Sequence, residues 1–111
     1  MADCLFCKIV AGEIPAKIVY RDDHAIGFSD LNPQAPLHAL VVPRAHVARL
    51  ADLSEVELGG RLLLAARRVA SDAGYGDGFR VVVNSGDAAG QTVKHLHVHV
   101  LGGRKFSWPP G

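Results

Sequence analysis

The sequence has little of what marks a secreted or membrane-spanning protein. Only 2 of its 111 residues are cysteines, and no apolar run approaches the roughly 20 residues that a helix needs to cross a bilayer. The first twenty residues show no secretory signal pattern. Two cysteines in such a chain are expected as thiols or metal ligands rather than as a structural disulfide. We therefore expect a cytoplasmic protein that does not engage a membrane.

Net charge is also nearly absent, because 12 Lys and Arg residues stand against 11 Asp and Glu residues. A formal charge of +1 predicts no broad basic surface for nucleic acid, so local groups must bind any anionic ligand. The length fits one domain over residues 1–111. Apolar residues make up 49% of the chain, which is enough for a core, although small domains often gain stability by oligomerising.

The order of predicted elements indicates an α+β fold. Residues 4–11 are expected to form a short helix, and Ser54 with Glu57 forms a capping box that opens a long helix ending near Ala73. Strands are expected at residues 17–20, 24–29, 38–42, 79–84 and 93–101. Five short strands that do not alternate with helices predict a mostly antiparallel sheet.

The last predicted strand carries His95, His97 and His99 at alternate positions. Alternate side chains of a strand share one face, with about 7 Å between neighbours, so three imidazoles would form a row. A merely solvent-facing strand explains this pattern poorly, because imidazole is not a usual choice for a polar face. A catalytic row and a zinc centre built from these histidines both remain open.

Two further segments are ambiguous by themselves. Residues 84–92 are small, polar and glycine-rich, so their backbone amides could surround a phosphate, or they could form an ordinary flexible connection. Cys4 and Cys7 form a Cys-x-x-Cys pair that could be a redox pair, half of a metal site or a coincidence. The βαβ context of a thioredoxin-like pair is not predicted here.

The run His-Leu-His-Val-His-Val at residues 95–100 resembles the signature of the histidine-triad (HIT) family. Residues 30–38, 42–46 and 101–104 follow the same family's order, and the ending Trp-Pro-Pro-Gly at 108–111 resembles the Hint branch. Members of that branch are purine nucleoside phosphoramidases. The resemblance implies a HIT fold, a homodimer whose two sheets join into one, and cleavage of the P–N bond of AMP-type phosphoramidates.

The resemblance also implies roles for individual residues. His97 would be the nucleophile that forms a covalent nucleotidyl-histidine intermediate, and His99 would contact the phosphate. The other nucleotide-binding positions would be Asp30 at the ribose hydroxyls, Leu31 beside the base, Asn84 at the phosphate or ribose side, Gly90, Gln91 and Thr92 around the phosphate, and Trp108 in a tail that reaches the partner's active site. Thr92 replaces a common Ser and Ala89 a common Gly, which leaves the preferred leaving amine open.

Some relatives combine the Cys-x-x-Cys pair with two histidines to bind a structural zinc ion. The matching positions here are Cys4, Cys7, His46 and His95. Four protein ligands close the coordination shell, so this zinc would stabilise the fold and the chemistry would need no cofactor. Two alternatives stay open from the sequence: a zinc hydrolase that uses the histidine row as ligands, and a nucleotide-binding regulatory module.

Overall fold

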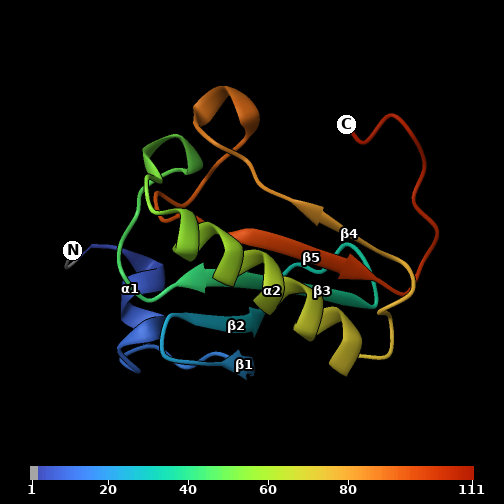
Figure 1. The fold of residues 1–111 in the computed structure, drawn as a ribbon, viewed down its shortest axis with the longest axis horizontal. Helices are drawn as coiled ribbons and strands as arrows, with labels where there is room; N and C mark the ends of the chain where they lie inside the picture. Colours follow the sequence, from blue (N-terminus) through green and yellow to red (C-terminus); the bar gives the residue numbers. More distant parts are fainter. Residues whose placement is uncertain (1–2) are drawn as a thin grey trace.

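The computed structural model describes residues 3–111 and confirms the predicted α+β fold. Its elements are α1 (Leu5–Val10), β1 (Ile18–Arg21), β2 (Ala25–Ser29), β3 (Leu37–Pro43), η1 (Leu50–Asp52), α2 (Val56–Asp72), β4 (Phe79–Val82), η2 (Asp87–Ala89) and β5 (Val98–Gly102). The five strands form one antiparallel sheet in the order β1-β2-β3-β5-β4 (Figure 1). Every neighbouring pair is antiparallel.

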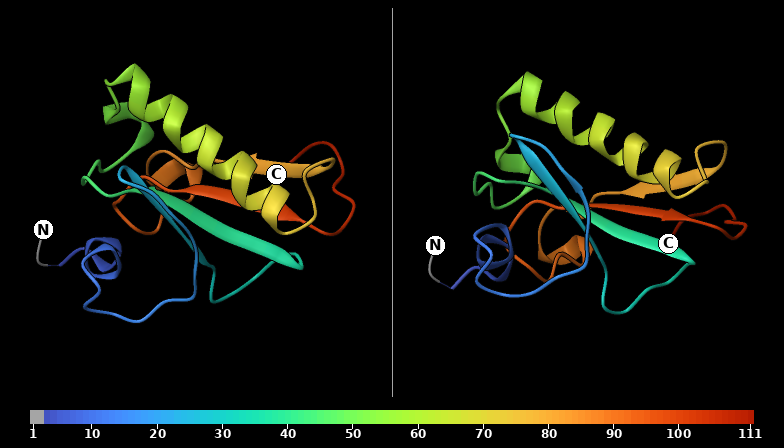
Figure 2. Two further views of the ribbon diagram at one scale, coloured as in Figure 1. Left: turned by 60° about the horizontal axis from the view of Figure 1, so that its bottom comes forward. Right: turned by 90° about the horizontal axis from the view of Figure 1, so that it is seen from below.

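The two α-helices cover opposite faces of the sheet (Figure 2). On one face, α2 buries Leu62 and Val69 against Val41 and Val100. On the other face, the shorter α1 contributes to a second cluster, which consists of Phe6, Ile9, Ile26, Phe28, Leu40 and Val42. Within residues 3–111, no helix is both long and apolar enough to cross a membrane.

The start of α2 differs from the prediction. The helix begins at Val56 with Glu55 as its N-cap, and no side chain caps it by a hydrogen bond. Ser54 therefore lies one residue before the capping position, where its hydroxyl cannot take the N-cap's role. The predicted capping box between Ser54 and Glu57 is wrong, although the predicted long helix is present.

The last strand is also shorter than predicted, because β5 begins at Val98 and not at residue 93. Its ladder with β3 starts where Val98 pairs with Val41. Farther along β3, Pro43 has no N–H to donate, and its carbonyl lies 2.9 Å from Nε2 of His95. The chain before Val98 is therefore outside the ladder, and this departure determines where the histidines point.

Candidate functional site

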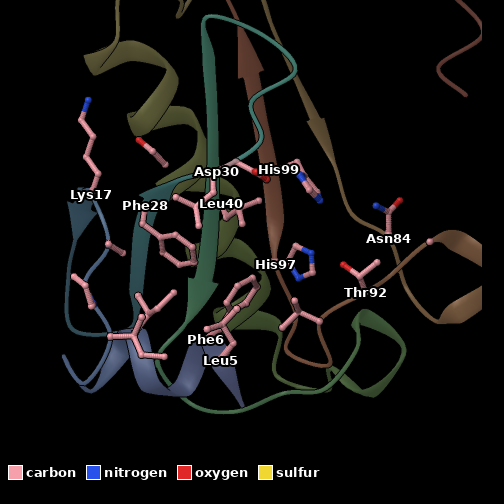
Figure 3. Close-up of a pocket in the computed structure, with 18 residues that line it drawn as sticks. Leu5, Phe6, Lys17, Phe28, Asp30, Leu40, Asn84, Thr92, His97 and His99 are labelled. Carbon is pink, nitrogen blue, oxygen red and sulfur yellow. The ribbon is translucent and has the colours of Figure 1, made fainter. Parts of the chain in front are cut away.

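A pocket of about 590 Å³ opens between α1 and the sheet. One part of its wall is apolar and is formed by Leu5, Phe6, Ile9, Ile14, Phe28 and Leu40. Another part is polar and includes Asp30, Asn84, Thr92, His97 and His99. In Figure 3, the two histidines lie between Phe28 and Asn84. A ligand that fits this wall combines a flat apolar group with a polar or charged one.

His97 is held in one tautomer by the backbone. Its Nδ1 lies 2.7 Å from the carbonyl oxygen of His95, and a carbonyl can only accept a hydrogen bond. Nδ1 therefore carries the proton, which leaves a lone pair on Nε2. The ring is 6% exposed, and the ring of Phe6 packs against it at 5.1 Å and 90°. With Nδ1 bonded to the backbone at a pocket wall, the ring presents Nε2 as the nitrogen suited to nucleophilic attack.

His99 lies next to His97, with 5.1 Å between the two ring centroids. Burial and, to a smaller extent, the neighbouring rings of His97 and His38 lower the pKa of His99 to about 4, although Asp30 acts in the opposite direction. His99 is therefore neutral at pH 7. Its Nδ1 lies 2.9 Å from Nε2 of His38, a buried residue on β3. No role for His38 was expected from the sequence, although a histidine within an apolar strand is a usable signal.

The predicted metal ligands Cys4, Cys7, His46 and His95 come together, with all four ligand atoms within 4.8 Å of one another. The Sγ atoms of Cys4 and Cys7 lie 3.3 and 3.5 Å from Nδ1 of His95, and Cys7 Sγ lies 3.3 Å from Nδ1 of His46. These separations match the edges of a zinc tetrahedron, roughly 3.5 Å for ordinary Zn–S and Zn–N bond lengths.

The protonation of His95 also fits a metal ligand. Its Nε2 donates to the carbonyl of Pro43, so the lone pair is on Nδ1 and faces both cysteines. Burial lowers the pKa of His95, which keeps the ring neutral as a ligand must be. This group of four residues could hold a metal ion such as zinc.

The three histidines do not form the single row that the sequence predicted. His95 precedes β5 and faces the cysteines, whereas His97 and His99 line the pocket. Among residues 3–111, the second group that could hold a metal ion consists of Asp30, His38 and His99. Neither group contains His97. A zinc centre built from the whole histidine row therefore has no geometric support.

The residues of the predicted phosphate loop, 84–92, also differ in whether they line the pocket. Asn84, Gly90 and Thr92 line the pocket, but Gln91 is 4% exposed and does not. The Gln91 side chain accepts a hydrogen bond from the Gly86 amide and donates to the carbonyls of Ala48 and Val93. The Gln91 side chain therefore holds the loop together, and the expectation that Gln91 lines the phosphate stays a prediction.

The remaining predicted residues lie at the pocket's edge or away from it. Asp30 and Leu31 line the pocket, and the Leu31 side chain is fully exposed there. Trp108 is 83% exposed and does not line the pocket of its own chain. The backbone just before it accepts a hydrogen bond from Arg80 at Ser107.

Comparison with known proteins agrees with this geometry. The HIT domain profile matches residues 11–106 of the chain. An uncharacterised HIT-like protein of Synechocystis is 53% identical over 111 residues, which cover 98% of this chain and 97% of that protein. A solved HIT family hydrolase from Legionella pneumophila is 44% identical with a TM-score of 0.95, and the match covers 98% of this chain and all of that one.

A zinc-bound histidine-triad protein from Mycobacterium smegmatis has the same fold. Its identity to this chain is 34% and its TM-score 0.85, and the match covers 96% of this chain and 79% of that one. The profile match, the Synechocystis relative and the arrangement of the histidines all indicate the same family. The chain belongs to the histidine-triad (HIT) family.

Proposed function

We propose that the protein is a hydrolase that cleaves the P–N bond of purine nucleoside 5′-phosphoramidates through a covalent nucleotidyl-histidine intermediate. The observation that carries the proposal is His97, a pocket histidine whose Nδ1 is bonded to the His95 carbonyl and whose Nε2 keeps its lone pair. The Legionella relative is named a hydrolase, which supports the reaction class.

The two parts of the pocket wall suit the two ends of a nucleotide. A purine would pack among the apolar side chains near Phe6, Phe28 and Leu40, beside the exposed Leu31. Asp30 would accept hydrogen bonds from the ribose hydroxyls, since its carboxylate reaches the pocket wall. The 5′-phosphate would then lie near the histidines, where Asn84, Gly90 and Thr92 complete the wall.

The reaction would take place in two displacements at phosphorus. In the first, Nε2 of His97 attacks, the P–Nε2 bond forms, and the P–N bond breaks as its electron pair leaves on the amine nitrogen. The amine gains a proton from solvent. In the second, water attacks the phosphorus, the P–Nε2 bond breaks and AMP is released with the net consumption of one water molecule. The hydrogen bond from Nδ1 to the His95 carbonyl would stabilise the cationic imidazole of the intermediate.

Zinc is the metal we propose for Cys4, Cys7, His46 and His95, because the ligand chemistry and spacing fit it and the Mycobacterium smegmatis relative is zinc-bound. The ion would supply a cross-link between the start of α1 and two later segments of the chain. With four protein ligands it would offer no open position to substrate, so the hydrolysis would not use it.

We also propose a homodimer. β4 (Phe79–Val82) is an edge strand of the sheet, so its free backbone groups can pair with the same strand of a second copy. Such pairing would continue the sheet across the dimer. It would also give the exposed Trp108 tail a route to the partner's pocket.

Substitution of the nucleophile tests the proposed function. His97→Ala removes the attacking nitrogen and leaves the apolar wall, so kcat should fall by several orders of magnitude while AMP still binds. His24→Ala, which changes an exposed histidine that does not line the pocket, is the matched control and should keep the wild-type rate. Near-full activity in His97→Ala would contradict the mechanism, and loss of activity on chelation alone would favour a zinc hydrolase. A wild-type protein that binds AMP without turnover would indicate a regulatory module.

A further inference from the structure

Both ring nitrogens of His38 have hydrogen-bonding partners. The backbone N–H of Gln34 donates to Nδ1 at 3.0 Å. On the other edge of the ring, Nε2 lies 2.9 Å from Nδ1 of His99 and 3.4 Å from a carboxylate oxygen of Asp30. His38 is 8% exposed, so water has little access to replace these partners. The ring thus connects the loop before β3 to the pocket.

The Gln34 amide determines where the proton of His38 is. A backbone N–H can only donate, so Nδ1 of His38 accepts and carries no proton. A neutral imidazole without a proton on Nδ1 carries it on Nε2. That N–H faces Nδ1 of His99 and, at a longer distance, the Asp30 carboxylate. The Asp30 carboxylate is an acceptor, so it favours the same tautomer of His38.

The tautomer of His99 follows from that of His38. Because Nδ1 of His99 accepts, the single proton of its neutral ring is on Nε2. Among the residues that the structure describes, no hydrogen-bond partner for this Nε2 is found, and the side chain lines the pocket (Figure 3). His99 thus offers an N–H where the adjacent His97 offers a lone pair. The two neighbouring rings are held in opposite tautomers.

We propose that His38 is a positioning residue, which together with the Gln34 backbone amide holds His99 as an N–H donor toward the pocket. The role for catalysis rests on the proposed function, in which this N–H would bind a phosphoryl oxygen while His97 attacks. The chain of hydrogen bonds ends at an amide that cannot accept a proton, so it fixes a tautomer and does not relay protons. His38 itself does not line the pocket, so its role is to position His99 and not to contact the substrate.

NMR of the wild-type protein, labelled with ¹⁵N at histidine and free of substrate, tests the tautomers directly. Long-range ¹H–¹⁵N correlations at pH 7 should show His99 protonated at Nε2 and His97 protonated at Nδ1. Loss of one set of signals in His99→Asn and of the other in His97→Ala assigns them. A His99 protonated at Nδ1 in the wild-type protein would overturn the proposal, whatever the enzyme's substrate.

A pair of substitutions then tests the role in catalysis. His38→Gln keeps an N–H donor near the position of Nε2, whereas His38→Asn keeps only the acceptor near Nδ1. In His38→Asn, His99 should become a mixture of tautomers and kcat should fall about tenfold with KM changed less than about twofold, the scale of one lost hydrogen bond. His38→Gln should restore both the tautomer and most of kcat.

Unchanged signals from His97 and from the exposed His24 show that each variant is folded. A His38→Asn protein with wild-type His99 signals and wild-type kcat would refute the proposal. If a variant does not fold, the wild-type spectrum still decides the tautomer. If the wild-type protein shows the predicted tautomers but hydrolyses no phosphoramidate, the proposed function fails and the assignment of His99 as a donor stands.

Discussion

Replacement of Gln91 with methionine should destabilise the protein and leave nucleotide binding nearly unchanged. The Gln91 side chain accepts from the Gly86 amide at 2.9 Å and donates to the carbonyls of Ala48 and Val93 at 2.7 and 2.9 Å. Methionine is of similar length but makes none of these bonds, so three backbone groups lose their partner inside the protein. Each net bond contributes about 1 kcal/mol, and leaving the half-buried backbone partners unpaired adds to this, so we expect a loss of about 2–4 kcal/mol.

Urea unfolding followed by circular dichroism measures this loss. With a typical urea m-value of about 1–3 kcal/mol per molar, the midpoint should fall by roughly 1–2 M. Gln34→Met is the matched control, because within residues 3–111 the exposed Gln34 side chain makes one hydrogen bond, to the Asn32 carbonyl. Its effect should stay within about 0.5 kcal/mol. If Gln91→Met keeps the wild-type midpoint but raises KM for the nucleotide, the side chain contacts phosphate and the structural reasoning is wrong.

Three further predictions concern the metal, the ribose and the tail. Protein purified without chelator should contain about one zinc per chain, and Cys4→Ser should lose it with a larger drop in Tm than in turnover; metal-free protein of equal stability would contradict this. Ribonucleotides should be favoured over deoxyribonucleotides by about 1–3 kcal/mol in kcat/KM, and Asp30→Ala should erase this preference. A preference that survives in Asp30→Ala would refute the ribose-binding role of Asp30. Removal of residues 104–111 should change the discrimination between leaving amines while AMP affinity stays constant, whereas an equal loss for all substrates would mean that the tail only holds the dimer.

Local pattern was sufficient for most of the fold. The apolar positions of α2 recur at helical spacing, and Leu62, Ala66 and Val69 are indeed buried against the sheet. The strands lie within about two residues of their predicted ranges, except for β5. These features depend on side-chain periodicity and on neighbours in the sequence, which is why they could be predicted.

The split of the histidine triad could not be predicted from periodicity. Strict alternation placed His95 on the same face as His97, but the ring of His95 bonds to the carbonyl of Pro43 and faces Cys4 and Cys7. Those partners are 52, 91 and 88 residues away in the chain. The metal ligand set was nevertheless expected correctly as a cluster, because the family resemblance supplied what spacing alone did not.

The roles of Gln91 and His38 were missed for a related reason. A glutamine in a polar loop is usually exposed, and its burial depends on the Ala48 carbonyl, 43 residues earlier. The role inferred for His38 depends on its contact with His99, 61 residues later. In the same loop as Gln91, Gly86 and Gly90 both adopt positive φ angles that residues with a side chain rarely take.

Mass spectrometry of the quenched enzyme tests the central claim most directly. Protein mixed with an adenosine 5′-phosphoramidate and quenched during turnover should carry one added AMP moiety, and peptide mapping should place it on His97. The exposed His24 and the neighbouring His99 should remain unmodified, and the His97→Ala protein should carry no adduct. An active enzyme that shows no adduct under conditions that preserve phosphorus–imidazole bonds, or one modified at another residue, would contradict the proposed mechanism.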